Sequence, residues 1–179
     1  VGSEMCIRDS LKVIKSFTNA SVQGVVKANF YGLFDDRMHE IIEQNVESYA
    51  VVTIDEALSL RKLTSKPILL FQGVHEQNDY KMIEENNLDF TIHSSWQLKG
   101  LSDFNLENSR IWLKLNTGMN RLGFNDKDFL IALKEIEILN IKDIVLMSHL
   151  ASSETKSNPN NLKQIKKFID VTKKFSYLK

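Results

Sequence analysis

The stretch RIWLKLNTGMNRLGFNDKDFLIALKEIEIL, residues 110–139, decides the fold class of this chain. Residues 110–115 form a short apolar run that is typical of a strand, and residues 126–139 have the spacing of an amphipathic helix. The loop between them contains two glycines, which permit tight backbone turns. A strand followed by a helix is the repeating unit of a parallel α/β sheet.

The same unit recurs along the chain. Predicted strands cover residues 22–29, 48–53, 68–71, 88–93, 110–115 and 143–149. Predicted helices cover residues 35–45, 76–86, 126–139 and 159–175; another follows Asp55 as its cap, and a helix with Trp96 and Leu101 follows Ser94 or Ser95. This alternation predicts a parallel sheet with right-handed crossovers. A doubly wound open sheet and a β/α barrel both fit, and the barrel would be incomplete because it needs eight units.

The composition is that of an ordinary globular protein. Of 179 residues, 42% are hydrophobic and 26% are charged, which argues against disorder. The 23 Lys and Arg residues balance the 23 Asp and Glu residues, so we expect no nucleic-acid partner and no membrane association. No apolar run is long enough for a membrane span. No metal is expected either, because metal-ligand pairs at fixed spacing are missing.

The two ends of the chain differ from the rest. Residues 1–10, VGSEMCIRDS, have no secretory apolar region and no strand or helix period. They resemble a translated sequencing-adapter artefact, so we expect a non-native segment, followed by a short helix from Ser10 to Phe17. The single cysteine, Cys6, fits a reducing compartment such as the cytoplasm. The chain stops at Lys179 just after a helical stretch, which favours a fragment.

In both architectures, functional sites form at the carboxyl ends of the strands. The polar residues expected there are Lys27, Asn29, Tyr31, Gln72, His75, His93, Lys114, Asn116, Arg121 and His149. Each histidine by itself is typical of a loop or capping residue. Arg121, between two glycines, could bind an anionic oxygen in a planar, bidentate way.

Lys27 is the most informative single residue. It lies in the apolar stretch VQGVVKAN, residues 22–29, and two-residue alternation puts it on the same strand face as Val25 and Asn29. A desolvated lysine has a lowered pKa and can attack a carbonyl to form a Schiff base. The alternative is a lysine at a strand end whose amine reaches water.

Three stretches resemble motifs of the alanine racemase family, in its order and at about its spacing. They are VVKANFYG (residues 25–32), KLNTGMNRLGF (114–124) and MSHLASSE (147–154). In addition, TIDEALSLR (53–61) is similar to the helix after the second barrel strand of that family. The resemblance implies a β/α barrel that binds pyridoxal 5'-phosphate, followed by a β-rich domain. Residues 11–179 would then be a barrel truncated after about six units, with the C-terminal β domain absent.

The resemblance also implies roles for five residues. Lys27 matches the catalytic lysine that forms the Schiff base with the cofactor and acts as a base on one face of the substrate. Tyr31 matches the tyrosine that reaches the cofactor phosphate, Arg121 the arginine near the phenolic oxygen, and His149 the histidine beside the ring. Lys114 matches a supporting lysine that is carbamylated in many members.

The implied function is the interconversion of L-alanine and D-alanine, which supplies D-alanine for peptidoglycan. The family is homodimeric, and its second base is a tyrosine of the partner's β domain, so this chain alone is expected to be inactive. Asn116 and Asn120 depart from the residues that many members have there. The alternatives are a non-catalytic pyridoxal-phosphate-binding barrel protein, a racemase for another amino acid such as serine, and a lysine Schiff-base aldolase.

Overall fold

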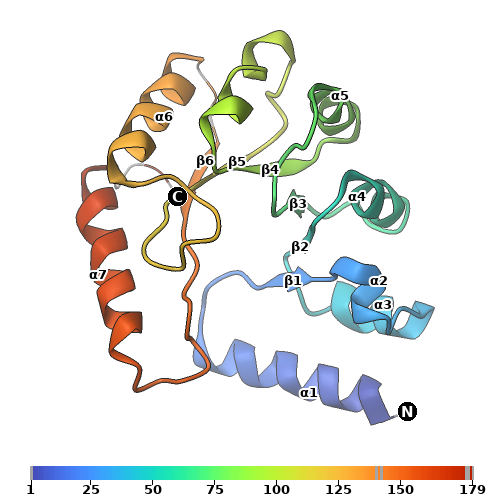
Figure 1. The fold of residues 1–179 in the computed structure, drawn as a ribbon. Helices are drawn as coiled ribbons and strands as arrows, with labels where there is room; N and C mark the ends of the chain where they lie inside the picture. Colours follow the sequence, from blue (N-terminus) through green and yellow to red (C-terminus); the bar gives the residue numbers. More distant parts are fainter. Residues whose placement is uncertain (1, 140, 142, 176–177, 179) are drawn as a thin grey trace. The chain divides into compact units, whose positions relative to one another are not determined.

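The computed structural model describes residues 2–139, 141, 143–175 and 178. The chain forms two compact units, residues 1–71 and residues 72–179. Strands and helices alternate along each unit, as the ribbon in Figure 1 shows. All six predicted strands are present, and each is shorter than predicted.

The first unit carries three parallel strands. Its elements are α1 (Gly2–Phe17), β1 (Gln23–Val25), α2 (Lys27–Tyr31), α3 (Asp36–Glu43), β2 (Ser48–Val51), α4 (Ile54–Arg61) and β3 (Ile68–Leu70). β2 pairs with both β1 and β3, with Gln23 beside Ser48 and Tyr49 beside Ile68. The centre of this unit is apolar because the side chains of β2 and β3 are almost fully buried.

Capping residues fix where the helices of this unit begin. Asp35 accepts a hydrogen bond from the N–H of Met38 at 2.6 Å and starts α3. Thr53 and Glu56 form a reciprocal capping box that starts α4, with bonds of 3.3 Å and 3.2 Å. The prediction that Asp55 caps this helix is wrong. Asp55 lies in the first turn, where its charge favours the helix N-terminus.

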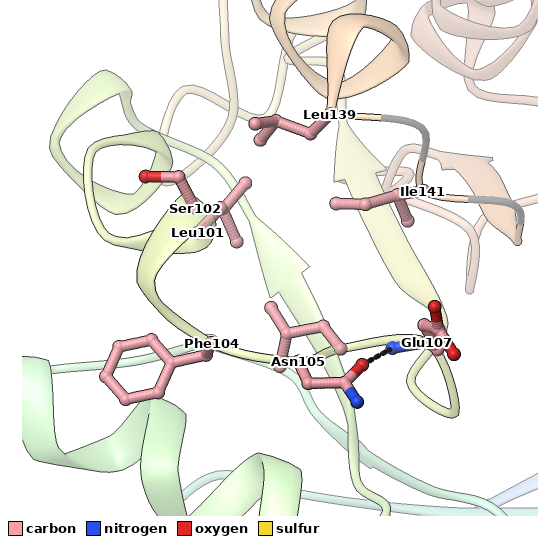
Figure 2. Close-up of a pocket in the computed structure, with 8 residues that line it drawn as sticks. Leu101, Ser102, Phe104, Asn105, Glu107, Leu139 and Ile141 are labelled. Carbon is pink, nitrogen blue, oxygen red and sulfur yellow. Dashed lines mark hydrogen bonds between the residues drawn. The ribbon is translucent and has the colours of Figure 1, made fainter.

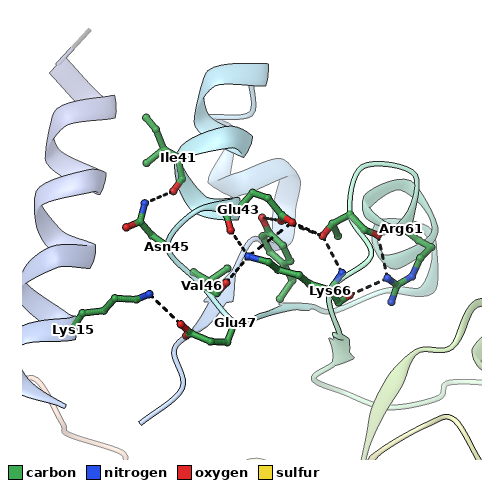
Figure 3. A network of polar contacts seen from close by, with 10 residues as sticks. Lys15, Ile41, Glu43, Asn45, Val46, Glu47, Arg61 and Lys66 are labelled. Carbon is green, nitrogen blue, oxygen red and sulfur yellow. Dashed lines mark hydrogen bonds and ion pairs between the residues drawn. The ribbon is translucent and has the colours of Figure 1, made fainter. Parts of the chain in front are cut away.

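A polar network closes the carboxyl end of α3 (Figure 3). The Nζ of Lys66 donates to the carbonyl oxygens of Glu43 and Val46. The hydroxyl of Tyr49 donates to the Glu43 carboxylate at 2.7 Å. Lys66 thus satisfies the last carbonyl of the helix and the carbonyl of Val46 beyond it, and so joins the end of α3 to the segment before β3.

The helix α1 differs from the prediction. It runs without a break from Gly2 to Phe17, so the prediction that residues 1–10 have no helical period is wrong. Ile7, Leu11 and Ile14 recur at helical spacing and line a cavity of about 430 Å³ together with β1 and α3. These apolar side chains explain why the helix extends through the decapeptide. That the decapeptide is non-native stays a prediction.

The second unit carries the other three strands, again parallel. Its elements are α5 (Gln77–Asn86), β4 (Asp89–Ile92), η1 (Ser95–Leu98), η2 (Leu101–Asp103), β5 (Ile111–Lys114), α6 (Asp126–Ile138), β6 (Ile144–Met147), α7 (Pro159–Thr172) and η3 (Lys173–Phe175). β5 pairs with both β4 and β6, with Thr91 beside Trp112 and Lys114 beside Met147.

The core of the second unit lies between these strands and their helices. α6 buries one apolar stripe, consisting of Phe129, Ala132, Leu133 and Ile136. The helix predicted around Trp96 and Leu101 is instead two short 3₁₀ turns, η1 and η2. The side chain of Ser94, at the start of η1, makes no capping hydrogen bond. Gly100 separates the two turns, so no continuous helix forms.

Two structural features are absent from the described part of the chain. Within it, no helix combines the length and the apolar character that crossing a membrane requires. Across the same residues, no group of three or more His, Cys, Asp and Glu side chains is arranged to hold a metal ion.

Candidate active site

Lys27 follows the carboxyl end of β1. The strand ends at Val25, although the N–H of Val26 still donates to the carbonyl of Ala50 at 3.0 Å. Lys27 is the first residue of the turn α2, so the prediction that it alternates with Val25 and Asn29 along one strand face is wrong. Its side chain is partly buried.

The turn α2 is a turn of left-handed helix. The backbone φ angles are 51° at Ala28, 53° at Asn29 and 58° at Phe30, and Tyr31 also has a φ of 58°. Residues with a Cβ lose roughly 1–2 kcal/mol each in this conformation, because the Cβ crowds a carbonyl oxygen. Such backbone persists only where its surroundings over-determine it, which happens most often at functional sites.

Hydrogen bonds and one buried ring hold this turn. The N–H of Phe30 donates to the carbonyl of Val26 at 3.0 Å, and the N–H of Gly32 donates to that of Ala28 at 2.9 Å. The ring of Phe30 is buried, with its centroid 5.1 Å from that of Phe34. Packing of Phe30 therefore offsets part of the conformational cost of the turn.

Lys27 and Tyr31 lie next to each other on this turn. The Nζ of Lys27 is 5.8 Å from the centroid of the Tyr31 ring. The two residues are four positions apart, which brings their side chains together on a helical turn. Tyr31 is 61% exposed, so an amine and a phenol stand together where a ligand can reach them.

Glu56, on α4, binds the same turn. Its Oε1 accepts the N–H of Ala28 at 2.8 Å, and its Oε2 accepts the N–H groups of Val52 at 2.8 Å and Thr53 at 3.2 Å. Burial acts to raise the pKa of this carboxyl, but the three donors and the charge of Lys27 together hold the pKa below its usual value. Glu56 is therefore a carboxylate at neutral pH.

In the second unit, Lys114 is the last residue of β5. It is only 5% exposed, and both this burial and the nearby charge of Arg121 lower the pKa of its ammonium group. Arg121 itself is exposed. The structure thus brings together these two predicted residues, one buried and one facing solvent.

The loop between Lys114 and Phe124 folds back on itself. The N–H of Phe124 donates to the carbonyl of Lys114 at 2.9 Å, and the N–H of Asn116 donates to that of Phe124 at 2.8 Å. A Cβ on Gly123 would lie 2.9 Å from the nitrogen of Asn116, so only glycine lets the two backbones meet. The side-chain oxygen of Asn116 accepts the N–H groups of Gly118 and Asn120, each at 3.1 Å.

Gln164, a buried residue of α7, joins this loop to the segment after β6. Its Nε2 donates to the hydroxyl of Thr117 at 3.1 Å and to the carbonyl of His149 at 3.0 Å. Its Oε1 accepts the N–H of Ala151 at 2.9 Å. The hydroxyls of Thr117 and Ser148 are 2.7 Å apart. His149, the sixth-strand histidine of the sequence analysis, is thus held at its backbone while its side chain is exposed.

His93 directly follows β4 and has a structural role. Its Nε2 lies 3.0 Å from the carbonyl oxygen of Gln72, and its N–H donates to the Oε1 of Gln97 at 2.9 Å. Burial, and less strongly the charge of Lys114, lower the pKa of this imidazole. This arrangement agrees with the interpretation of His93 as a loop or capping residue.

Figure 2 shows a cavity of the second unit that none of the site residues described above lines. Its volume is about 300 Å³, and its walls come from the segment around η2 and from the end of α6 (Figure 2). None of the five predicted site residues lines it. A second cavity, of about 510 Å³, lies between α2 and α4 and is lined by Phe30, Glu56 and other residues of those elements.

Two residues of the site were missed by the sequence analysis. Glu56 follows Thr53 by three positions, which is the signature of a capping box, so this pattern could have identified its bonds within α4. Its bond to Ala28 has no sequence signal, because the two residues are far apart in the chain. Gln164 has no signal either, since it occupies one of many polar positions on a Lys-rich helix.

The fold and the site define an α/β protein of the strand–helix repeat class, with lysines at the carboxyl ends of its first and fifth strands. The family model described as alanine racemase, N-terminal domain, matches residues 5–179. Alanine racemase from Xylella fastidiosa (strain 9a5c) is 35% identical over 165 residues, which cover 90% of this chain and 46% of that protein. The Mannheimia succiniciproducens enzyme is 32% identical over 183 residues, which cover 96% and 49%. The chain belongs to the alanine racemase N-terminal domain family.

Solved structures agree with this family. The alanine racemase of Acinetobacter baumannii matches with a TM-score of 0.88 at 24% identity, over 98% of this chain and 53% of that one. The biosynthetic enzyme of Pseudomonas aeruginosa matches with a TM-score of 0.83 at 26% identity, over 94% and 48%. These matches confirm the predicted fold class, part of a β/α barrel. The chain spans about half the length of the curated relatives it matches.

Proposed function

We propose that this chain is the cofactor-binding part of an alanine racemase and that Lys27 is its cofactor lysine. The observation that carries the proposal is the left-handed turn after β1, which sets the amine of Lys27 5.8 Å from the ring of Tyr31. Membership of the alanine racemase family supplies the reaction class. Cytoplasmic location and the supply of D-alanine to peptidoglycan follow from the same proposal.

The residues present fit pyridoxal 5'-phosphate. An amine is needed to hold the aldehyde of this cofactor, and Lys27 provides one beside an exposed phenol. Donors are needed for its oxygens, and the exposed guanidinium of Arg121 can donate in a planar fork. Tyr31 is assigned to the phosphate, Arg121 to the phenolic oxygen and His149 to the ring face, in each case by the family resemblance.

The reaction needs a proton to leave the α-carbon of an amino acid on one face and to return on the other. When bound, pyridoxal phosphate supplies an electron sink for the negative charge that this removal creates. Lys27 supplies a base for one face. The base for the other face is assigned to a tyrosine of a partner subunit, as the resemblance implies, and the active protein is then a homodimer.

Lys114 has the chemistry that carbamylation requires. Carbon dioxide adds to a neutral amine to form an N–C bond, and a proton is released to solvent. Burial together with the charge of Arg121 lowers the pKa of Lys114, which favours the neutral amine. Carbamylation would replace the ammonium by an anion that pairs with the Arg121 guanidinium. We assign Lys114 this supporting role, in which it orients Arg121.

The substrate is proposed to be alanine. A histidine racemase from Leuconostoc mesenteroides has the same fold, with a TM-score of 0.80 at 24% identity. The same barrel is thus used with a different amino acid in that protein, so the test below includes histidine and serine beside alanine.

The test uses a chimaeric protein that joins this chain to the C-terminal half of the Xylella fastidiosa alanine racemase. Assayed with alanine, histidine and serine, it is expected to interconvert the enantiomers of alanine only. Borohydride reduction and peptide mapping should find pyridoxal phosphate on Lys27. Lys27→Ala removes both properties, whereas Lys62→Ala, a change at an exposed lysine of the same unit, removes neither. Cofactor trapped on another lysine of the unsubstituted chimaera would refute the assignment of Lys27.

A further inference from the structure

Glu56 makes one hydrogen bond that helix capping does not explain. Its bonds to Val52 and Thr53 serve the first turn of α4, the helix to which it belongs. The bond from the N–H of Ala28, at 2.8 Å, comes from a segment 28 residues away along the chain. This N–H belongs to the peptide group that directly follows Lys27.

A second capping carboxylate in the chain shows the contrast. Asp79, in the first turn of α5, accepts the N–H groups of His75 at 2.7 Å and Glu76 at 3.2 Å. These two donors immediately precede its own helix, as Val52 and Thr53 precede α4. Asp79 thus makes the same local bonds as Glu56. Among the hydrogen bonds of the described residues, it accepts none from a distant turn, so it serves as the matched control.

We propose that Glu56 is a positioning residue for Lys27: its carboxylate locks the peptide group between Lys27 and Ala28 and so aims the lysine amine. The inference rests on the proposed function and adds to it a residue that does not touch the cofactor. The left-handed turn begins at Ala28, where a conformational cost must be offset by contacts. The Glu56 bond is a charge-assisted contact at that point, and such bonds are about twice as strong as neutral ones.

The charge state of Glu56 supports the same inference. Its pKa lies below the usual value, so the carboxylate accepts from Ala28 throughout the neutral range. Both oxygens are used, Oε1 for Ala28 and Oε2 for Val52 and Thr53. In Glu56→Gln one of the two oxygens becomes an NH₂ group that faces an N–H donor. The single remaining oxygen satisfies two donors at the start of α4 but only one at Ala28, so we expect the variant to lose the bond to Ala28.

The experiment compares Glu56→Gln with two control variants, all in the chimaeric protein of the preceding test. Asp79→Asn changes the matched capping carboxylate, and Thr53→Ala removes the other half of the Glu56 capping box while leaving the Ala28 bond. One readout is the hydrogen-exchange rate of the Ala28 amide. The other is the share of pyridoxal phosphate that borohydride fixes on Lys27, relative to all other lysines. We expect Glu56→Gln alone to raise the exchange rate about tenfold or more, since a bond to a charged group contributes about 1.5–3 kcal/mol, and to spread the label away from Lys27.

Two results would overturn the inference. One is an unchanged Ala28 exchange rate and label distribution in Glu56→Gln; the other is an equal loss in Thr53→Ala, which would reduce Glu56 to a helix cap. If Glu56→Gln does not fold, the unsubstituted protein is followed towards acid, where protonation of Glu56, whose pKa lies below its usual value, is expected to release the Ala28 amide. An Ala28 amide that stays protected after Glu56 is protonated would overturn the inference. If the unsubstituted chimaera fixes no cofactor on Lys27, the proposed function fails, while the exchange measurements still decide whether Glu56 holds the turn.

Discussion

Four consecutive residues of α2 carry side chains in a backbone region that favours glycine. They are Ala28, Asn29, Phe30 and Tyr31, and Lys27 directly precedes them. The side chains of Lys27 and Tyr31 meet because the turn is helical, so the unusual backbone is what creates the candidate cofactor contact. At the scale of single residues, conformational cost and function are therefore found at the same place.

Ala28→Gly tests this cost directly. Ala28 is exposed and has a φ of 51°, so removing its Cβ relieves roughly 1–2 kcal/mol of left-handed crowding. The added freedom of glycine in the unfolded chain offsets about 0.5–1 kcal/mol of that gain. We expect a net stabilisation of about 0.5–1 kcal/mol in urea unfolding. Ala57→Gly, in the right-handed helix α4, should instead destabilise by about 1 kcal/mol or more. Destabilisation by both changes would contradict the left-handed assignment.

Among the elements, α7 does more than cover the sheet of its unit. Its residue Gln164 is 4% exposed and makes three hydrogen bonds, to Thr117, His149 and Ala151. These partners belong to the segments that follow β5 and β6. One side chain of a helix thereby fixes the loops that carry Arg121 and His149.

Gln164→Leu keeps the approximate size of the side chain and removes all three bonds. We expect a loss of roughly 2–4 kcal/mol in the free energy of unfolding, because buried polar partners are left unsatisfied. Faster hydrogen exchange should appear at the amide of Ala151, which donates to Gln164. Leu162→Ala, a change on the same helix at a residue that is 74% exposed, should cost less than about 0.5 kcal/mol. Equal losses in the two variants would show that the helix, and not Gln164, is what stabilises these loops.

At the scale of the whole molecule, charge balance and exposed apolar side chains act together. The formal net charge is 0 at pH 7. Leu162, Ile165 and Ile169 on α7 are between 43% and 74% exposed. Proteins without net charge repel one another least, so apolar surface is then most able to associate.

Solubility should therefore be lowest near pH 7 and should rise on either side, as turbidity or the saturating concentration would report. Replacing the exposed lysines Lys163 and Lys166 by glutamate makes the net charge negative, and the minimum should move below pH 7. Lys163→Arg keeps the charge and should leave the minimum where it is. If the pH of lowest solubility stays the same after the glutamate substitutions, charge balance does not control association.

The sequence by itself determined the alternation of strands and helices, because short apolar runs, amphipathic spacing and capping residues act within a few positions. It also named Lys27, Tyr31, Lys114, Arg121 and His149, which stay predictions for cofactor binding. Local signals did not show that 3₁₀ turns follow β4.

Only the tertiary structure decided the conformation of the turn that carries Lys27. From Ala28 to Tyr31 only Asn29 is of a type that adopts the left-handed conformation readily, and it does so as a single residue, so the local sequence does not predict a left-handed turn. The turn exists because Phe30 is buried and because a carboxylate from α4 accepts the N–H of Ala28. The burial of Lys114, which lowers its pKa, likewise depends on neighbours that only the folded chain brings together. At Lys27 and Lys114, contacts between distant segments outweigh the preferences of the local sequence for backbone conformation and for solvent exposure. No local sequence pattern records such contacts.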